Sequence, residues 1–252
     1  THLERGDRTS VTAGGVAGIH FEADRQVYLS FAEPADGGAR TAVARATLAE
    51  EGLRETTVIF RQKQARAGAN HFGSRLVLTR DGHLFITMGD RYDARDQVQD
   101  LGTHFGKIVR VRTDGTVPPD NPFVNTARAL PDIWSFGHRN VQGAALHPGT
   151  GRLWAHEHGA MGGDEVNVVL AGRNYGWPVI THGVDYSGAK IGEGPAKAGM
   201  EQPQHVWVPS IAPSGMVFYT GKQFPGWRGS LFVGALAGRQ VVRLTADDKK
   251  IL

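Results

Sequence analysis

The stretch DGHLFITMGD at residues 81–90 and the stretch GKIVRVRTDG at residues 106–115 decide the class of fold. The first is a short apolar run that begins at an Asp-Gly turn signal and ends at a glycine and an acid. In the second, every other residue is apolar, which is the period of a strand buried on one face. The two stretches therefore predict neighbouring strands of an antiparallel sheet.

This strand pattern recurs along the chain. Apolar or aromatic strands that follow a turn, or that alternate in the same way, are predicted at residues 24–34, 41–50, 150–159, 213–221, 228–238 and 239–248. Repeated hairpins of this kind predict an all-β fold, a β-propeller, with a β-sandwich as the alternative. Only residues 47–57 invite a helix, and Gly52 within them argues against one.

The composition limits the classes of function. A chain of 252 residues with 34 glycines suits a single β-propeller domain over residues 1–252, because many tight turns join short strands. The net charge of +3 comes without a concentrated lysine or arginine tract, so we expect no nucleic-acid partner. The chain has no run of eighteen apolar residues and no cysteine. We therefore expect no membrane span, no disulfide and no thiol nucleophile.

The segment HEHGAMGGDEVNVV at residues 156–169 has the residue types of a metal site. Imidazole and carboxylate are common protein ligands, and glycine lets backbone carbonyls turn toward an ion. His156 and His158 share one face of a strand, so zinc is one interpretation, although no third ligand is evident. A polar loop whose histidines are hydrogen-bonded is the other, and the residue types alone leave both open.

Five segments in order, at residues 69–90, 133–148, 153–188, 209–219 and 231–238, carry a resemblance to a known family. They resemble the soluble aldose sugar dehydrogenases that depend on pyrroloquinoline quinone (PQQ), and their glucose dehydrogenase relatives. The resemblance implies a six-bladed β-propeller with PQQ on its central axis, an aldose substrate and an electron acceptor that stays unidentified. It also implies a periplasmic or secreted protein, either a monomer or a homodimer.

The same resemblance implies a calcium site in the glycine-rich loop. Gly159 and Ala160 match positions whose backbone carbonyls bind calcium, and Ala160 stands where the family usually has proline. Glu165 and the carbonyl of Tyr175 match further calcium ligands, and a hard cation takes carboxylate and carbonyl oxygen together. Asp164 is a neighbour of this set.

The resemblance also implies the catalytic residues. His71 matches the general base that accepts the proton of the C1 hydroxyl, and histidine suits this role because its ordinary pKa lies near neutral pH. Asn70 takes the place of an acid that orients this base in glucose dehydrogenases. Arg139 matches the electrophile beside the quinone carbonyls, where its charge favours the arriving hydride.

Further residues match contacts of the cofactor in the family. Besides Arg139 these are Asn140, Tyr186, Trp207 and Ser210. Tyr186 is an aromatic neighbour for the flat quinone, whereas Trp207 and Ser210 suit packing equally well. Trp177 in the YGWP segment is interpreted as a core residue.

Two departures from the family pattern open alternatives. Ala237 occupies the position of a lysine that binds the cofactor carboxylates, with Arg239 two residues on, and no match for a cofactor-binding glutamine is found at residues 12–20. The chain also lacks the family's later arginine pair, so both ends are expected to be shortened. The alternatives are a catalytically impaired propeller that binds calcium and sugar or protein, and a calcium-dependent lactone hydrolase.

Overall fold

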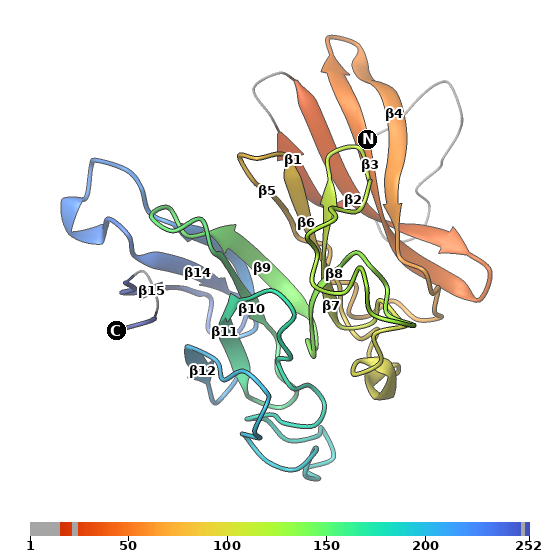
Figure 1. Ribbon diagram of the computed structural model, residues 1–252. Helices are drawn as coiled ribbons and strands as arrows, with labels where there is room; N and C mark the ends of the chain where they lie inside the picture. The colour runs from red at the N-terminus through yellow and green to blue at the C-terminus, as the bar shows by residue number, and fades with distance from the viewer. Residues whose placement is uncertain (1–15, 22–24, 248–249) are drawn as a thin grey trace.

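The computed structural model describes residues 16–21, 25–247 and 250–252, which form four antiparallel β-sheets (Figure 1). The first sheet contains β1 (Val16–Phe21), β2 (Gln26–Ala35), β3 (Gly38–Ala49) and β4 (Gly52–Arg61). The second contains β5 (Leu76–Leu78), β6 (His83–Thr87), β7 (Lys107–Arg112) and β8 (Ile133–Phe136). The third contains β9 (Val141–Leu146), β10 (Leu153–Glu157), β11 (Asp164–Val169) and β12 (His205–Trp207). The fourth contains β13 (Pro213–Phe218), β14 (Leu231–Ala235) and β15 (Gln240–Leu244).

Each sheet is a meander in which consecutive strands are neighbours. The first strands of successive sheets also contact one another, β1 with β5, β5 with β9 and β9 with β13, so the sheets follow one another as propeller blades do (Figure 1). The prediction of an all-β propeller is confirmed, and the two-sheet sandwich is not the arrangement found. The described residues form four such sheets, and the ring of six stays a prediction.

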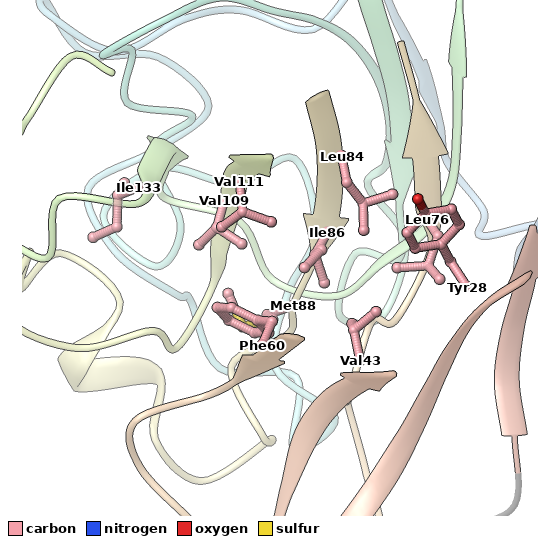
Figure 2. Packing of buried hydrophobic residues seen from close by; sticks show 10 residues of the cluster. All are labelled: Tyr28, Val43, Phe60, Leu76, Leu84, Ile86, Met88, Val109, Val111 and Ile133. Atoms are coloured by element: carbon pink, nitrogen blue, oxygen red, sulfur yellow. The ribbon is translucent and has the colours of Figure 1, made fainter. Parts of the chain in front are cut away.

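An apolar core joins the first sheet to the second. It contains Tyr28, Val43, Phe60, Leu76, Leu84, Ile86, Met88, Val109, Val111 and Ile133, and Figure 2 shows these side chains meeting between the two sheets. Along β6, Leu84 and Ile86 face this core, whereas Phe85 packs into the next core, between the second and third sheets. The alternation along a strand thus buries both faces of the sheet, one against each neighbour.

The third and fourth sheets are joined in the same way. Leu153 and Ala155 of β10 face the second sheet, whereas Trp154 between them faces the fourth. The Trp154 indole meets Phe218 edge to face, with ring centroids 5.5 Å apart. Successive cores therefore fix each sheet against the next and hold the loops at the sheet ends in place.

The predicted strands at residues 81–90 and 106–115 are β6 and β7, which pair directly. Residues 47–57 form no helix, because β3 turns back into β4 through Gly52. A strand at Val16–Phe21 was not predicted, and it gives the first sheet its fourth strand. Residues 12–15, part of the stretch searched for the cofactor-binding glutamine, lie outside the described residues.

Helices are almost absent from the described part of the chain. It holds two 3-10 turns of three residues each, Arg95–Gln97 and Pro225–Trp227. Within that part, no helix is long and apolar enough to cross a membrane.

Candidate functional site

Loops from the second and third sheets converge at one end of the molecule. His71 precedes β5, Asp90 follows β6, and Arg139 lies between β8 and β9. Main-chain bonds tie these loops together: the Asp90 N–H donates to the Arg139 carbonyl over 2.8 Å, and the Arg91 N–H donates to the His71 carbonyl over 3.3 Å. A Cβ atom at Gly89 would lie 2.2 Å from the His71 carbonyl oxygen, so only glycine allows this close approach.

His71 forms a pair with Asp90. The imidazole Nδ1 lies 2.6 Å from Asp90 Oδ1, and the aspartate side chain is only 1% exposed. The carboxylate accepts two more hydrogen bonds, from the Tyr92 N–H and from the Trp177 indole N–H, each over 2.8 Å. Because Nδ1 is engaged by the acid, Nε2 is the nitrogen left for proton transfer.

Asp90 therefore takes the orienting role that the sequence assigned to Asn70. Asn70 contributes its backbone carbonyl, which accepts a hydrogen bond from the Arg91 side chain. Asp90 is the last residue of the stretch 81–90, and the sequence pattern indicated it only as the end of a strand. A carboxylate after a strand that ends beside His71 is the signal that could have identified Asp90.

Arg91 holds the loop that presents His71. Its guanidinium is buried, and it donates to the backbone carbonyls of Ala39, Arg66, Gly68 and Asn70, at 2.6–3.3 Å. The same group lies 3.6 Å from the centre of the Phe72 ring, and burial lowers its pKa from the ordinary value. His71 has a φ of +53°, so this clamp supports a backbone conformation that non-glycine residues rarely adopt.

Arg139 lies on the other side of Trp177. Its Nη1 donates to the carbonyls of His158, over 3.2 Å, and of Gly159. The guanidinium carbon lies 5.3 Å from the centre of the Trp177 ring. A pocket of about 390 Å³ is lined by Asp90, Arg139, Trp177 and Tyr186. The acid that holds His71 and the predicted electrophile therefore border one pocket.

The predicted cofactor contacts divide into two groups. Tyr186 lines the pocket and is 60% exposed, and Ala160, predicted to bind calcium, lines this pocket as well. Asn140 is buried and its Oδ1 accepts a hydrogen bond from Gln142. Trp207 packs on the core between the third and fourth sheets. The structure thus brings Arg139 and Tyr186 to the pocket, whereas Asn140 and Trp207 do not line it.

Ser210 belongs to a loop that Asp164 holds. Asp164 Oδ2 accepts hydrogen bonds from Ser210 Oγ and from the N–H groups of Ile211 and Ala212, while Oδ1 accepts from the Gly159 N–H over 2.9 Å. Four donors occupy this buried carboxylate, so it ties two loops together. The Ala237 N–H donates to the Ile211 carbonyl, which brings the turn containing Ala237 against the same loop.

A second, small cavity of about 10 Å³ adjoins the pocket. Gly159, Glu165 and Tyr175, three of the four predicted calcium ligands, line it together with Glu157. Glu157 and Glu165 are directly opposed on β10 and β11. Burial, reinforced by the negative charge of Glu157, raises the pKa of Glu165 to about 8, and Asn167 donates a hydrogen bond to it over 3.2 Å.

Glu157 is positioned by His138, a residue to which the sequence gave no role. His138 Nδ1 lies 2.9 Å from Glu157 Oε1, and its Nε2 lies 2.9 Å from Ser135 Oγ. The buried imidazole also stacks on Tyr175, with ring centroids 4.7 Å apart. The second oxygen of Glu157 accepts the Arg139 N–H. This network aims one carboxylate at the cavity and links it to the Arg139 loop.

The geometry gives the zinc interpretation no support. His156 points into the core between the third and fourth sheets, and burial lowers its pKa to about 3. His158 Nε2 lies 2.7 Å from the Pro213 carbonyl oxygen. No group of three or more His, Cys, Asp or Glu side chains within the described ranges could hold a metal ion. Two carboxylates with backbone carbonyls form a different kind of site, one that suits a hard cation.

Known proteins match this chain over nearly all its length. The family model described as Glucose / Sorbosone dehydrogenase matches residues 10–252. The aldose sugar dehydrogenase YliI of Escherichia coli (strain K12) is 43% identical over 236 residues, which cover 92% of this chain and 63% of that relative. This chain therefore spans less than two thirds of the length of that relative.

Two solved structures have a similar fold. A crystal structure of a glucose dehydrogenase matches with a TM-score of 0.92 and 47% identity, covering 95% of this chain and 71% of the other. The PQQ-bound form of an aldose sugar dehydrogenase from Streptomyces coelicolor matches with a TM-score of 0.73 and 28% identity, covering 94% and 65%.

Proposed function

Because this chain belongs to the Glucose / Sorbosone dehydrogenase family, we propose that the protein oxidises aldose sugars at C1, with PQQ as cofactor and calcium as a bound cation. The observation that carries the proposal is the pocket bordered by Asp90, which holds His71, and by Arg139. His71 is not itself among the residues that line the pocket, and Asp90 connects it to the pocket wall. A base held in this way and a fixed positive charge are what hydride abstraction from an alcohol needs. The aldose sugar dehydrogenase relative and the PQQ-bound neighbour support this choice of reaction and cofactor.

The pocket has some side chains that fit the cofactor. PQQ is flat and anionic, and the pocket offers the aromatic rings of Trp177 and Tyr186 with the guanidinium of Arg139. The pocket is also lined by Asp90, Asp93, Asp96 and Asp185, and Arg95 pairs with Asp185. Arg139 and Tyr186 are the residues that would hold the cofactor. When bound, PQQ supplies a two-electron acceptor for the C1 hydride.

Residues of the chain itself would accept the proton of the C1 hydroxyl and stabilise the negative charge that develops. His71 accepts the proton of the C1 hydroxyl through Nε2, while Asp90 keeps the ring in place and stabilises the imidazolium that forms. General-base catalysis of this kind contributes a factor of about 10² to 10⁴. Arg139 favours the negative charge that develops beside it, an effect of about 3–4 kcal/mol for one well-placed donor.

Calcium suits the small cavity for electrostatic reasons. Glu157 and Glu165 bring two carboxylates together, and the surrounding groups neutralise only part of that charge. A hard cation bound by Glu165, with carbonyl oxygens of Gly159 and Tyr175, would supply the missing positive charge. It would also connect β11 to the loops that carry Gly159 and Tyr175.

A specific observation favours the alternative of a propeller that binds calcium and sugar or protein without turnover. The Gly159 carbonyl, predicted to bind a calcium ion that touches the quinone, accepts a hydrogen bond from Arg139. Ala237 replaces the family's lysine, so the cation expected for the cofactor carboxylates is absent at that position. Both features would weaken cofactor binding.

Reconstitution separates these functions. Purified protein is supplied with calcium and PQQ, and reduction of an artificial dye is followed with glucose and other aldoses. The proposal expects reduction that requires both additions and an aldose. Calcium binding without dye reduction would replace it with the binding function, and lactone hydrolysis without quinone would replace it with the hydrolase. The periplasmic or secreted location belongs to the same proposal, and cell fractionation of the native protein tests it.

A further inference from the structure

Trp177 touches both halves of the site. Its indole N–H donates to Asp90 Oδ2 over 2.8 Å, and its ring lies under the Arg139 guanidinium at 5.3 Å. The side chain is buried and lines both the pocket and the small cavity. The sequence predicted a core residue, and Trp177 indeed packs in an apolar cluster with Ala94, Val98, Phe105, Ala160 and Ile191. Its polar nitrogen nevertheless points at the acid that holds His71.

The main chain of Trp177 is fixed from two sides. Its N–H donates to the Gly137 carbonyl over 2.9 Å, and its carbonyl accepts from Gln99 Nε2 over 2.8 Å. Gly137 lies two residues before Arg139, and a Cβ there would meet the Gly176 nitrogen at 2.5 Å. The indole therefore has little freedom to follow any movement of Asp90.

Charged and polar groups face the His71–Asp90 pair from several elements. Arg95, Asp96 and Asp185 line the same pocket as Asp90, and the Tyr92 ring meets the His71 ring edge to face. Asp90 Oδ1 is shared by His71 and the Tyr92 N–H, whereas the donor on Oδ2 is Trp177. His158 and Arg139 lie on the third-sheet side, and the Arg91 guanidinium faces carbonyls of the His71 loop. Further toward solvent, Asp93 is paired with Arg66.

The indole bond controls how much of the Asp90 charge acts on His71. A hydrogen bond to a carboxylate stabilises its negative charge and reduces its attraction for a neighbouring proton. Without the Trp177 donor, Asp90 would hold a proton on His71 more strongly. The imidazole would then stay protonated to higher pH, and less of it would be available as a base.

We propose that Trp177 is a positioning residue of the oxidation: its indole N–H fixes Asp90 and limits how strongly that carboxylate holds a proton on His71, while its ring seats Arg139. This inference rests on the proposed function for its catalytic meaning. Its physical content, the link from Trp177 through Asp90 to His71, is a property of the chain without cofactor.

The test is Trp177→Phe, which keeps an aromatic ring under Arg139 and removes the N–H. Histidine-labelled protein without PQQ is titrated by NMR, and the midpoint of the His71 ring signal is expected to rise by about half a pH unit. In the reconstituted enzyme, the acidic limb of the pH–rate profile should move upward by the same amount. The rate below that midpoint should fall about threefold, with KM nearly unchanged. An unmoved His71 midpoint overturns the proposal.

Trp154→Phe is the matched control, because that indole is equally buried and its N–H has no hydrogen-bond partner among the described residues. Trp154→Phe should change neither the His71 midpoint nor the pH–rate profile. If Trp177→Phe does not fold, the indole N–H signal of Trp177 in the unaltered protein gives the answer. During the pH titration, that signal should shift with the same midpoint as the His71 ring signal. A Trp177 signal that does not change at this midpoint contradicts the proposal. A protein that shows the coupling by NMR but no dye reduction would contradict the proposed function alone.

Discussion

Two fully buried histidines, His138 and His156, have opposite surroundings. His138 lies between β8 and β9, and His156 lies on β10. Both ring nitrogens of His138 have partners, Ser135 and Glu157. Neither ring nitrogen of His156 has a hydrogen-bond partner among the described residues. The first belongs to the site region, at the ends of the second and third sheets, and the second to the core between the third and fourth sheets.

The difference shows in which part of the molecule buried histidines are paired with carboxylates. In the site region, histidines are paired with carboxylates, as in His71–Asp90 and His138–Glu157, and these hydrogen bonds fix the orientation of both side chains. In the core between the third and fourth sheets, burial keeps His156 neutral, so it acts as a flat packing group. One motif, HEHG, thus supplies a cavity-lining acid and a core residue side by side.

The largest effect is expected from His71, the histidine that is paired with Asp90. His71→Ala should lower turnover of the reconstituted enzyme by a factor of about 10² to 10⁴, roughly 3–5 kcal/mol in barrier, because the base is removed. PQQ binding and thermal stability should be retained. His83→Ala is the control, since His83 also pairs with an aspartate, Asp81, but at the other end of β6. Full activity in His71→Ala would end the assignment of the base.

The next effect concerns the buried network. His138→Phe keeps a ring that can stack on Tyr175 but leaves Glu157 without its side-chain donor. Breaking a buried pair of this kind should lower the free energy of unfolding by about 3 kcal/mol. Urea unfolding in the presence of a chelator measures it. Ser135→Ala removes only the outer bond and should cost about 1 kcal/mol. Equal stability of His138→Phe and the unaltered protein would mean that the pair contributes no net stability.

A smaller effect is expected from the cation. Calcium at a hundredfold excess over its dissociation constant should raise the free energy of unfolding by about 2.7 kcal/mol, because it binds only the folded chain. Glu165→Gln should lose this gain in differential scanning calorimetry. Glu193→Gln, at an exposed acid paired with Lys197, should keep it. If the melting temperature changes with neither calcium nor chelator, Glu165 is not a metal ligand.

The fold was predictable from local patterns to a large extent. The stretches at 81–90 and 106–115 became β6 and β7, because alternation along a strand reports burial directly. The strand Val16–Phe21 escaped prediction, since a six-residue segment interrupted by a glycine carries little alternation. Which sheet each face meets follows from tertiary packing, and no local pattern contains it.

The site was predictable only in part. His71 and Arg139 came from the family resemblance, and their roles stay predictions. Asp90 and Glu157 were missed because an acid at a strand end serves equally as a boundary or as a partner, and the partner comes from another strand. The polar role of Trp177 was missed because an indole suits a core and only the direction of its N–H reveals the bond to Asp90.

The smallest expected effect lies in the unpaired histidine. The pKa of His156 is about 3 in the folded chain and 6.5 as a free group, so the unfolded chain takes up a proton first as the pH falls. His156 therefore lowers stability progressively as the pH drops from about 6.5 toward 3, by about 1.4 kcal/mol at pH 5.5. His156→Met, with an adaptable apolar side chain, should be close to the unaltered protein in stability at pH 8 and should lose less of it on acidification.

Urea unfolding of both proteins at pH 8 and pH 5.5 isolates this contribution, because every other titrating group is common to the two. If the two proteins lose the same stability between these pH values, His156 takes up no proton on unfolding. The contrast between paired and unpaired histidines would then be one of geometry without an energetic consequence.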